Sequence, residues 1–309
     1  MNELYILIIA LSIDLLCGEA PDRFHPVAWL GKHIGQILEF RPQTSPGRQL
    51  FFGAVIVIIY ASLIPLSVYF IMQLVQKAGI IPYLILSGYL LKNTFSIRGL
   101  WQAVEKVKSA LKMNDLTRAR RDVRALVSRD ADGLDQQGLI SATVESCAEN
   151  ICDSFVAPLF YFVICGLPGA LCYRIINTFD AMVGYHGSWE YTGKAAARID
   201  DVFNYIPARL SAFFILVSSL LCKLNTGGSW QTMLRDHRLT ESPNAGWTMS
   251  AMAGALNVML EKKGYYVLGD KIDELKLSSI TQSQCILLAS AACCILVVTG
   301  VEVAIHATS

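Results

Sequence analysis

Five long apolar runs constrain the fold of this chain more than any other feature of its sequence. They cover residues 50–75, 80–100, 155–176, 206–224 and 280–305. A helix of about 20 apolar residues is long enough to cross the hydrocarbon core of a bilayer. Backbone polar groups must pair internally there, so such runs adopt α-helices. The sequence therefore predicts an all-α, polytopic integral membrane protein with one membrane-embedded domain, residues 1–309.

The composition agrees with a membrane location. Apolar residues make up 53% of the chain and charged residues 17%, whereas soluble domains average about 45–50% and 25%. The net charge of +1 excludes nucleic-acid binding driven by bulk charge. A shorter apolar run, residues 4–17, lacks a preceding basic segment and a small-residue cleavage site. We therefore interpret it as a retained segment and not as a signal peptide.

A basic section lies between two of the apolar runs. Residues 98–132 hold nine Lys and Arg against five acids, which by the positive-inside rule predicts a cytoplasmic location. Apolar residues at helical spacing and a turn at Asn114-Asp115 predict two helices, so residues 102–143 form a cytoplasmic helical section. Its cations either form a solvated face or attract an anionic substrate.

The run at residues 155–176 is interrupted by Gly166-Leu167-Pro168-Gly169. Proline breaks the helical hydrogen-bond ladder, and the flanking glycines permit a tight turn. A re-entrant hairpin is one interpretation, and it returns the polar segments before and after the run to the same side of the membrane. A simple kinked span is the alternative.

Three acids precede this run at helical spacing: Glu145, Glu149 and Asp153 follow one another at i, i+4 and i+8. Like charges on one helix face repel, and acids at membrane depth are costly. The arrangement is explained if a cation lies among them, and carboxylates suit Mg²⁺ bound with nucleotide phosphates. The alternative is a solvated acidic turn at a helix N-terminus.

Polar residues gather in three further segments. Asn177 and Asp180 are predicted to share a helix face. Asp201 and Asn204 are predicted to share another, which directs Asp201 into a site and leaves Asp200 to pair with Arg198 or to meet solvent. The turn at Ser242-Pro243-Asn244 precedes a helix rich in small residues, which predicts close helix packing.

Six segments, in order, resemble the CobD/CbiB family of cobalamin biosynthesis. They are GEAPDRFHPVAWLG (18–31), SRDADGL (128–134), VESCAENICDSFVAPLFY (144–161), YRIINTFDAMVGY (173–185), AARIDDVFNYIPARL (196–210) and SPNAGWTMSAMAGAL (242–256). The resemblance covers about residues 12 to 269. It implies an adenosylcobinamide-phosphate synthase, which joins a carboxylate of adenosylcobyric acid to an amine and is driven by ATP. The amine is aminopropanol phosphate, free aminopropanol or ethanolamine phosphate.

The resemblance and the chemistry of the side chains together give a set of expected site residues. The catalytic residues are Glu145, Glu149, Asp153, Asp180, Asp201 and His25. Substrate and phosphate are expected to contact Arg129, Asn150, Asn177, Arg198, Asn204, Arg209, Ser242 and Asn244. Mg²⁺ is expected at Glu145, Glu149, Asp153 and Asp201. ATP and Mg²⁺ are implied by the resemblance, although the chain has no Walker A loop.

Two segments depart from the family pattern. Glu19 lies in Gly-Glu-Ala-Pro where the family usually has Gly-Asp-Pro, and Glu261-Lys262-Lys263 replaces part of a usual Leu-Gly-Gly segment. The resemblance further implies a multi-pass protein of the cell inner membrane, with its site facing the cytoplasm. Its expected partners are the corrinoid, the amino-alcohol phosphate, membrane lipid and other membrane enzymes of the pathway, but no nucleic acid.

A different class of function is the alternative to this enzyme. It is a non-catalytic membrane sensor or transporter that resembles the AmpE proteins. A transporter is expected to carry its charges near the middle of its spans, whereas most acids here lie at span ends.

Overall fold

The computed structural model describes residues 2–43, 45–127, 131–184, 187 and 189–308. Helices dominate these residues, together with one antiparallel pair of short strands. In chain order the elements are α1 (Asn2–Leu16), η1 (Asp22–Phe24), α2 (Pro26–Leu38), α3 (Pro46–Ala78), α4 (Ile80–Lys92), α5 (Ile97–Lys112), α6 (Leu116–Val123), α7 (Gln136–Ile151), η2 (Cys152–Val156), α8 (Ala157–Val183), α9 (Glu190–Phe203), α10 (Tyr205–Leu221), α11 (Thr226–Asp236), α12 (Ala245–Leu256), β1 (Leu260–Lys262), β2 (Tyr266–Leu268) and α13 (Leu277–Thr308).

Four helical segments of the described chain are long and apolar enough to cross a membrane. They are Pro46–Ala78, Ile80–Lys112, Gln136–Val183 and Leu277–Ala307. The pair Glu190–Phe203 and Tyr205–Leu221 makes a fifth if its two helices form one broken span. The prediction of a polytopic all-α membrane protein is confirmed.

The chain divides into two compact units. The first unit comprises Met1–Ser96, Ala157–Phe203 and Val298–Ser309, and the second comprises Ile97–Val156 and Asn204–Val297. Each unit is thus assembled from segments that lie far apart in the sequence.

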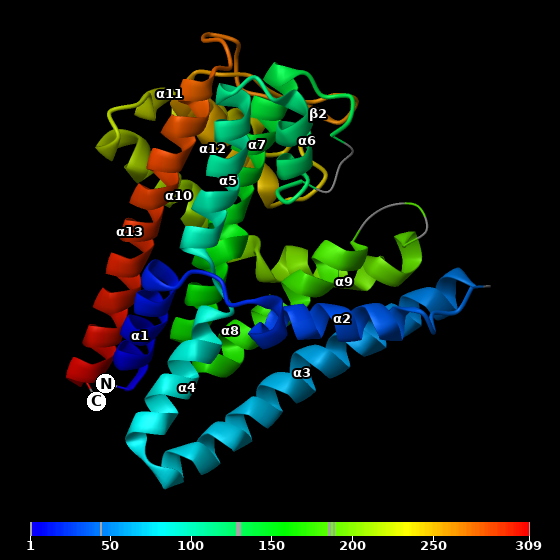
Figure 1. Cartoon of the computed structure of the whole chain (residues 1–309), viewed down its shortest axis with the longest axis vertical. Coiled ribbons are helices and arrows are strands. Elements are labelled where there is room, and N and C mark those ends of the chain that lie inside the picture. Colours follow the sequence, from blue (N-terminus) through cyan, green and yellow to red (C-terminus); the bar gives the residue numbers. More distant parts are fainter. Residues whose placement is uncertain (1, 44, 128–130, 185–186, 188, 309) are drawn as a thin grey trace. The chain divides into compact units, whose positions relative to one another are not determined.

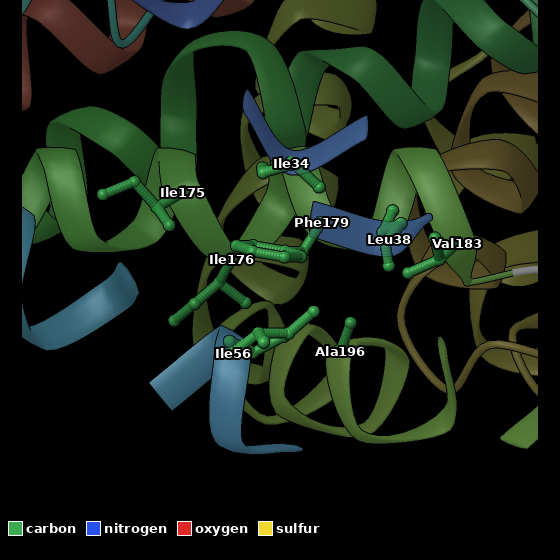
Figure 2. Packing of buried hydrophobic residues seen from close by; sticks show 9 residues of the cluster. Ile34, Leu38, Ile56, Ile175, Ile176, Phe179, Val183 and Ala196 are labelled. Carbon is green, nitrogen blue, oxygen red and sulfur yellow. The ribbon is translucent and has the colours of Figure 1, made fainter. Parts of the chain in front are cut away.

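The core of the first unit lies where α2, α3, α8 and α9 meet. Figure 2 shows Ile176 and Phe179 of α8 between Ile34 of α2 and Ile56 of α3. Helices α3 and α9 approach closely at Gly53, because a Cβ there would lie 1.9 Å from the carbonyl oxygen of Thr192. Helix α1 packs on α4, and the last turns of α13 lie beside α1 (Figure 1).

The predicted break in the third apolar run is a reversal of the chain. Gly166 has φ 63° and ψ −159°, a backbone conformation that interrupts α8 and suits glycine. The rings of Tyr161 and Tyr173 stack with centroids 5.5 Å apart, whereas twelve residues of continuous helix would separate them by about 18 Å. The backbone reversal agrees with the hairpin interpretation, while the side of the membrane that the chain reaches, on which the re-entrant hairpin and the simple kinked span differ, stays a prediction.

The second unit is built around α7. Every residue from Leu139 to Ala148 is buried, and α5, α6, α12 and β1 all pack on this helix. Helices α11 and α12 approach at Gly254, where a Cβ would lie 2.2 Å from the carbonyl oxygen of Gly228. This close approach agrees with the packing predicted from the small residues of α12. The two helices predicted in the basic section are α5 and α6.

Helix α7 continues into a π-helix, η2, which the sequence did not predict. Pro158 follows this segment. A proline ring clashes with the carbonyl four residues earlier and removes one helical hydrogen bond. In this chain that carbonyl belongs to Ser154, inside η2. The wider π turn accommodates the proline, and such turns occur frequently at functional sites.

Candidate functional site

Glu145 is a buried hydrogen-bond anchor in the second unit. Its side chain is 4% exposed. Oε1 accepts a hydrogen bond from Ser141 Oγ at 2.6 Å, and Oε2 accepts one from the Tyr266 hydroxyl at 2.9 Å. Ser141 Oγ also accepts from the backbone N–H of Glu261 at 3.1 Å. Glu145 and Ser141 together therefore attach the β1–β2 hairpin to α7.

The three acids of the motif lie in different surroundings. Glu145 is buried, Glu149 is exposed and Asp153 is half-buried in η2. Among the described residues, no three His, Cys, Asp or Glu side chains are grouped as a metal site would require. The four-residue Mg²⁺ set stays a prediction. The hydrogen bonds to both oxygens of Glu145 argue against that residue as a ligand, whereas Glu149 and Asp153 are the more exposed acids of the motif.

Hydrogen bonds and aromatic rings fix the orientation of the Arg209 guanidinium in the second unit. Its Nη1 donates to the carbonyl oxygen of Tyr205 at 2.6 Å and to Asn244 Oδ1 at 2.9 Å. The guanidinium carbon lies 3.7 Å from the centroid of the Tyr205 ring and 4.9 Å from that of the Trp247 ring. Two predicted site residues, Arg209 and Asn244, are thus brought together by α10 and α12.

Other predicted residues surround these elements in the second unit. Asn204 is buried at the N-cap of α10, where its Oδ1 accepts from Cys152 Sγ at 3.5 Å. This contact joins η2 to the start of α10. Ser242 Oγ accepts from the backbone N–H of Asn244 at 3.3 Å. Asn150 instead bonds within its own segment, donating to the carbonyl of Ser146 at 2.9 Å.

The predicted shared face of Asp201 and Asn204 does not form on one helix. Helix α9 ends at Phe203, and Asn204 caps the next helix. The break has a local cause. In a continuous helix the ring of Pro207 would clash with the carbonyl of Phe203, four residues earlier. That carbonyl instead accepts a hydrogen bond from the Tyr161 hydroxyl at 2.8 Å.

Burial excludes one of the two alternatives predicted for Asp200, contact with solvent, and its pairing with Arg198 stays a prediction. Asp200 is 8% exposed, so its expected contact with solvent is wrong. Asp201 is half-buried on the same helix, and Arg198 is exposed. Adjacent helical residues point about 100° apart, and here it is Asp200 that faces inward.

The remaining predicted residues of α8 lie in the first unit. Arg174 Nη1 donates to Asn177 Oδ1 at 2.9 Å. Asp180 lies against Gly184, where a Cβ would be 2.1 Å from Asp180 Oδ1. Arg174 also lines a cavity of about 290 Å³ with Trp29, Tyr60 and other residues of α2, α3, α4 and α8. Arg129 lies outside the described residues.

His25 belongs to an ionic cluster of the first unit that the sequence did not predict. His25 Nε2 lies 3.1 Å from Glu19 Oε2. Lys92 Nζ lies 2.9 Å from Glu19 Oε1 and 3.3 Å from Asp14 Oδ1. Ser96 also donates to Glu19 Oε1. One signal could have found Lys92: it lies inside the apolar run 80–100, where a lysine needs an anionic partner.

The ionic cluster changes the acidity of Glu19. Burial raises the pKa of its carboxyl, but the hydrogen bonds from His25 and Ser96 and the charge of Lys92 outweigh burial. The pKa falls from 4.5 to about 2. Glu19 is therefore ionised at neutral pH and acts only as an acceptor.

A family model and individual known proteins match this chain over most of its length, and they indicate the same family. A model of the CobD/CbiB protein family matches residues 7–288. A cobalamin biosynthesis protein CobD from Dehalococcoides mccartyi is 46% identical over 303 residues, which are 98% of each chain. A probable cobalamin biosynthesis protein CobD from Methanothermobacter thermautotrophicus is 42% identical over 91% of this chain and 95% of its own.

An archaeal relative from Methanocaldococcus jannaschii, also named a probable cobalamin biosynthesis protein CobD, is 37% identical over 87% of this chain and 89% of its own. No solved structure matches the chain. The family match and these identities extend across both units of the structure. The chain belongs to the CobD/CbiB family.

Proposed function

We propose that this protein acts in cobalamin biosynthesis as an ATP-dependent ligase. It joins a propionate carboxylate of adenosylcobyric acid to the amine of aminopropanol phosphate, and the product is adenosylcobinamide phosphate. The family membership and the names of the relatives support a role in cobalamin biosynthesis. The site faces the cytoplasm, because the basic section at residues 98–132 favours that side for the polar helices.

The orientation of the Arg209 guanidinium is the main support for this proposal. The backbone of Tyr205 and the side chain of Asn244 hold its Nη1, while the Tyr205 ring supports one face. Within the described part of the chain, Nε and Nη2 have no partner. They form the edge of the guanidinium that binds phosphate through two parallel hydrogen bonds. Arg209 is thus preorganised to hold a phosphate of ATP or of the amine substrate.

ATP converts the carboxylate of the corrinoid into an acyl phosphate, which an amine can attack. Glu149 and Asp153 would hold Mg²⁺, because they are the accessible acids of the motif. The ion would neutralise phosphate charge during the transfer. The incoming ammonium must lose a proton before its nitrogen can attack.

A reconstituted assay tests the proposal. Purified protein in lipid receives adenosylcobyric acid, ATP and Mg²⁺ with aminopropanol phosphate, aminopropanol or ethanolamine phosphate, and the product is identified by mass. We expect one amide per ATP cleaved, with the fastest turnover for a phosphorylated amine. Cleavage of ATP without amide formation, or no reaction with any amine, contradicts the proposal and favours a sensor or transporter.

Variants of Arg209 connect the assay to the structure. Arg209→Lys keeps the charge but loses the bidentate edge and the stacking on Tyr205. We expect a rise in KM of about 10–100-fold for one phosphorylated substrate, since a charged hydrogen bond is worth about 1.5–3 kcal/mol. Arg235→Lys is the matched control, because the guanidinium of Arg235 is already paired with Asp236 and Asp270. Unchanged KM values for Arg209→Lys would remove Arg209 from the site.

A further inference from the structure

Two cysteines of the second unit face each other. Cys222 is the residue that caps the C-terminus of α10, and Cys285 lies near the start of α13. Their sulfur atoms are 3.0 Å apart, and both residues are free thiols. A disulfide bond is about 2.05 Å long, so the two sulfur atoms need to approach by only about 1 Å to become bonded.

A second contact holds α10 and α13 together next to the cysteines. Ser218 lies one turn before Cys222, and its Oγ is 3.0 Å from the Oγ of Ser290 on α13. Both serine side chains are fully buried. This pair fixes the register of the two helices, so the folded protein keeps the two thiols close to each other.

Two other thiols of the second unit have different surroundings. Cys147 Sγ donates to the carbonyl oxygen of Ser283 at 3.8 Å, and Cys152 Sγ donates to Asn204 Oδ1 at 3.5 Å. Both of these cysteines are buried, and buried structural thiols are chemically inert. In the facing pair, by contrast, one thiol is half-buried and the other is exposed. A reagent can therefore reach this pair.

The facing thiols lie beside polar surface. Lys223 follows Cys222, and Thr281 lies one turn before Cys285; both of these polar residues are exposed. Helix α13 has 32 residues, which gives a length of about 48 Å. Because the hydrocarbon core of a bilayer is about 30 Å thick, part of α13 extends beyond it. The polar residues of 277–284 make the start of α13 the part that suits water, so a water-soluble reagent can reach Cys285.

We propose that Cys222 and Cys285 are a reversible redox site, which closes into a disulfide by exchange with a low-molecular-weight disulfide and thereby stabilises the second unit. The Cys285 thiolate attacks one sulfur of that disulfide, and a thiolate leaves with the electrons of the broken S–S bond. The Cys222 thiolate then attacks the Cys285 sulfur of the mixed disulfide and releases a second thiolate. The two protons lost by the cysteines go to the two leaving thiolates. Two thiols are thus oxidised and one disulfide is reduced.

Closure of this site would restrain a large part of the second unit. The two cysteines are 63 positions apart, and α11, α12 and the β1–β2 hairpin lie between them. A disulfide across such a loop restricts the unfolded chain and so favours the folded one. Asn244, which binds Arg209, lies within the loop. Disulfides in a reducing compartment are usually transient and redox-sensing, which agrees with a site that opens and closes. The inference does not depend on the ligase function.

Mass mapping tests the pairing in the parent protein. The purified protein in lipid is reduced, incubated with oxidised glutathione, treated with an alkylating reagent and digested. We expect a linked pair of peptides that contain Cys222 and Cys285, and dithiothreitol should separate them. Alkylation of both cysteines, or glutathione that stays on Cys285 while Cys222 is alkylated, would overturn the proposal.

Two variants test the order of the exchange. Cys222→Ser removes the thiol that resolves the mixed disulfide, so Cys285 should retain glutathione in this variant. Cys165→Ser is the matched control, because it removes another exposed thiol, which lies in the first unit. The linked peptides should form in this control as they do in the parent protein. Their absence from the control, or an unmodified Cys285 in Cys222→Ser, would contradict the proposed exchange.

Thermal unfolding gives a readout that is independent of mass mapping. Oxidised glutathione should raise the apparent melting temperature of the parent protein by several degrees, because the disulfide restricts the unfolded chain. The same treatment should not raise the melting temperature of Cys222→Ser. An unchanged or lower melting temperature of the linked parent protein would mean that the bond distorts the folded helices, and the proposal would fail.

Discussion

Glu19 in the first unit and Glu145 in the second unit have a similar structural role but different partners. Each carboxylate connects segments that are distant in the sequence. Glu19 lies beside Lys92 and His25, which are cationic or can become so. Glu145 accepts from two hydroxyl groups, those of Ser141 and Tyr266. The first arrangement is an ionic cluster, and the second is an anchor that includes two hydroxyl donors.

The difference shows that a buried acid is not by itself a sign of metal binding. Glu145 is a candidate ligand in the sequence, yet its oxygens accept hydrogen bonds from protein donors, as those of Glu19 do. Charged partners make a carboxylate sensitive to the loss of one partner, since the other charge is left buried. Loss of a hydroxyl donor removes one hydrogen bond from a carboxylate and leaves no uncompensated charge on the donor side.

Removal of Lys92 should give the largest effect. Lys92→Met leaves Asp14, whose side chain is fully buried, without its ammonium partner. Breaking a buried ion pair on one side costs about 3–5 kcal/mol. We expect a large fall in folded yield and in the apparent melting temperature in detergent. Adding Asp14→Asn to Lys92→Met should recover part of the loss, and no recovery would show that the charges are not coupled.

Glu149 and Glu145 provide a matched pair on one helix. If Glu145 is an anchor and Glu149 helps to hold Mg²⁺, Glu149→Gln should lower kcat by about 10²–10³-fold, as loss of one electrostatic group in a site does. Glu145→Gln keeps one acceptor oxygen and should stay within a few-fold of the parent. Turnover and folded fraction are measured together for both. A collapse of activity in a well-folded Glu145→Gln would reverse the comparison.

A smaller effect is expected at Tyr266. Tyr266→Phe removes the hydroxyl that donates to Glu145 Oε2, so a buried carboxylate loses one hydrogen bond. The expected loss of stability is about 1–3 kcal/mol. Tyr265→Phe is the control, since the ring of Tyr265 is 60% exposed at the tip of the hairpin. Thermal unfolding of both variants measures the difference, and equal melting temperatures would show that Glu145 is not an anchor.

The smallest effect is the pH dependence from Glu19. Its folded pKa of about 2 lies below the ordinary value of 4.5. The carboxylate therefore contributes stability that is fully present above pH 4.5 and is lost as the pH falls toward 2. The side chain is 37% exposed, so solvent weakens the contribution. The melting-temperature gap between parent protein and Glu19→Gln should narrow from pH 6 to pH 3, and a constant gap would contradict this assignment.

Local patterns in the sequence predicted much of the fold. The apolar runs predicted the spanning segments, and the spacing of Leu100, Val104 and Val107 predicted α5. The glycines around Pro168 predicted the reversal in α8. These predictions succeed because the spacing of apolar residues and the conformational freedom of glycine determine structure within a few residues.

The parts that were not predicted depend on distant contacts or on proline. Lys92 and Glu19 are 73 positions apart, and Tyr266 and Glu145 are 121 apart, so no local pattern joins them. The π-helix before Pro158 and the break before Pro207 moved Asp153 and Asn204 off the helix faces that a regular period assigns. Arg209 and Asn244 were both predicted as site residues, but their direct contact needed the packing of α10 on α12.

The central claim is that ATP activates the carboxylate of the corrinoid, and the path of its oxygen tests this most directly. Adenosylcobyric acid labelled with ¹⁸O in the reacting carboxylate is turned over with ATP and aminopropanol phosphate. In an acyl phosphate a carboxylate oxygen bridges carbon and phosphorus. Attack by the amine breaks the C–O bond, so one ¹⁸O atom should appear in inorganic phosphate for each amide formed. Amide formation with no ¹⁸O in any phosphorus-containing product would contradict the account.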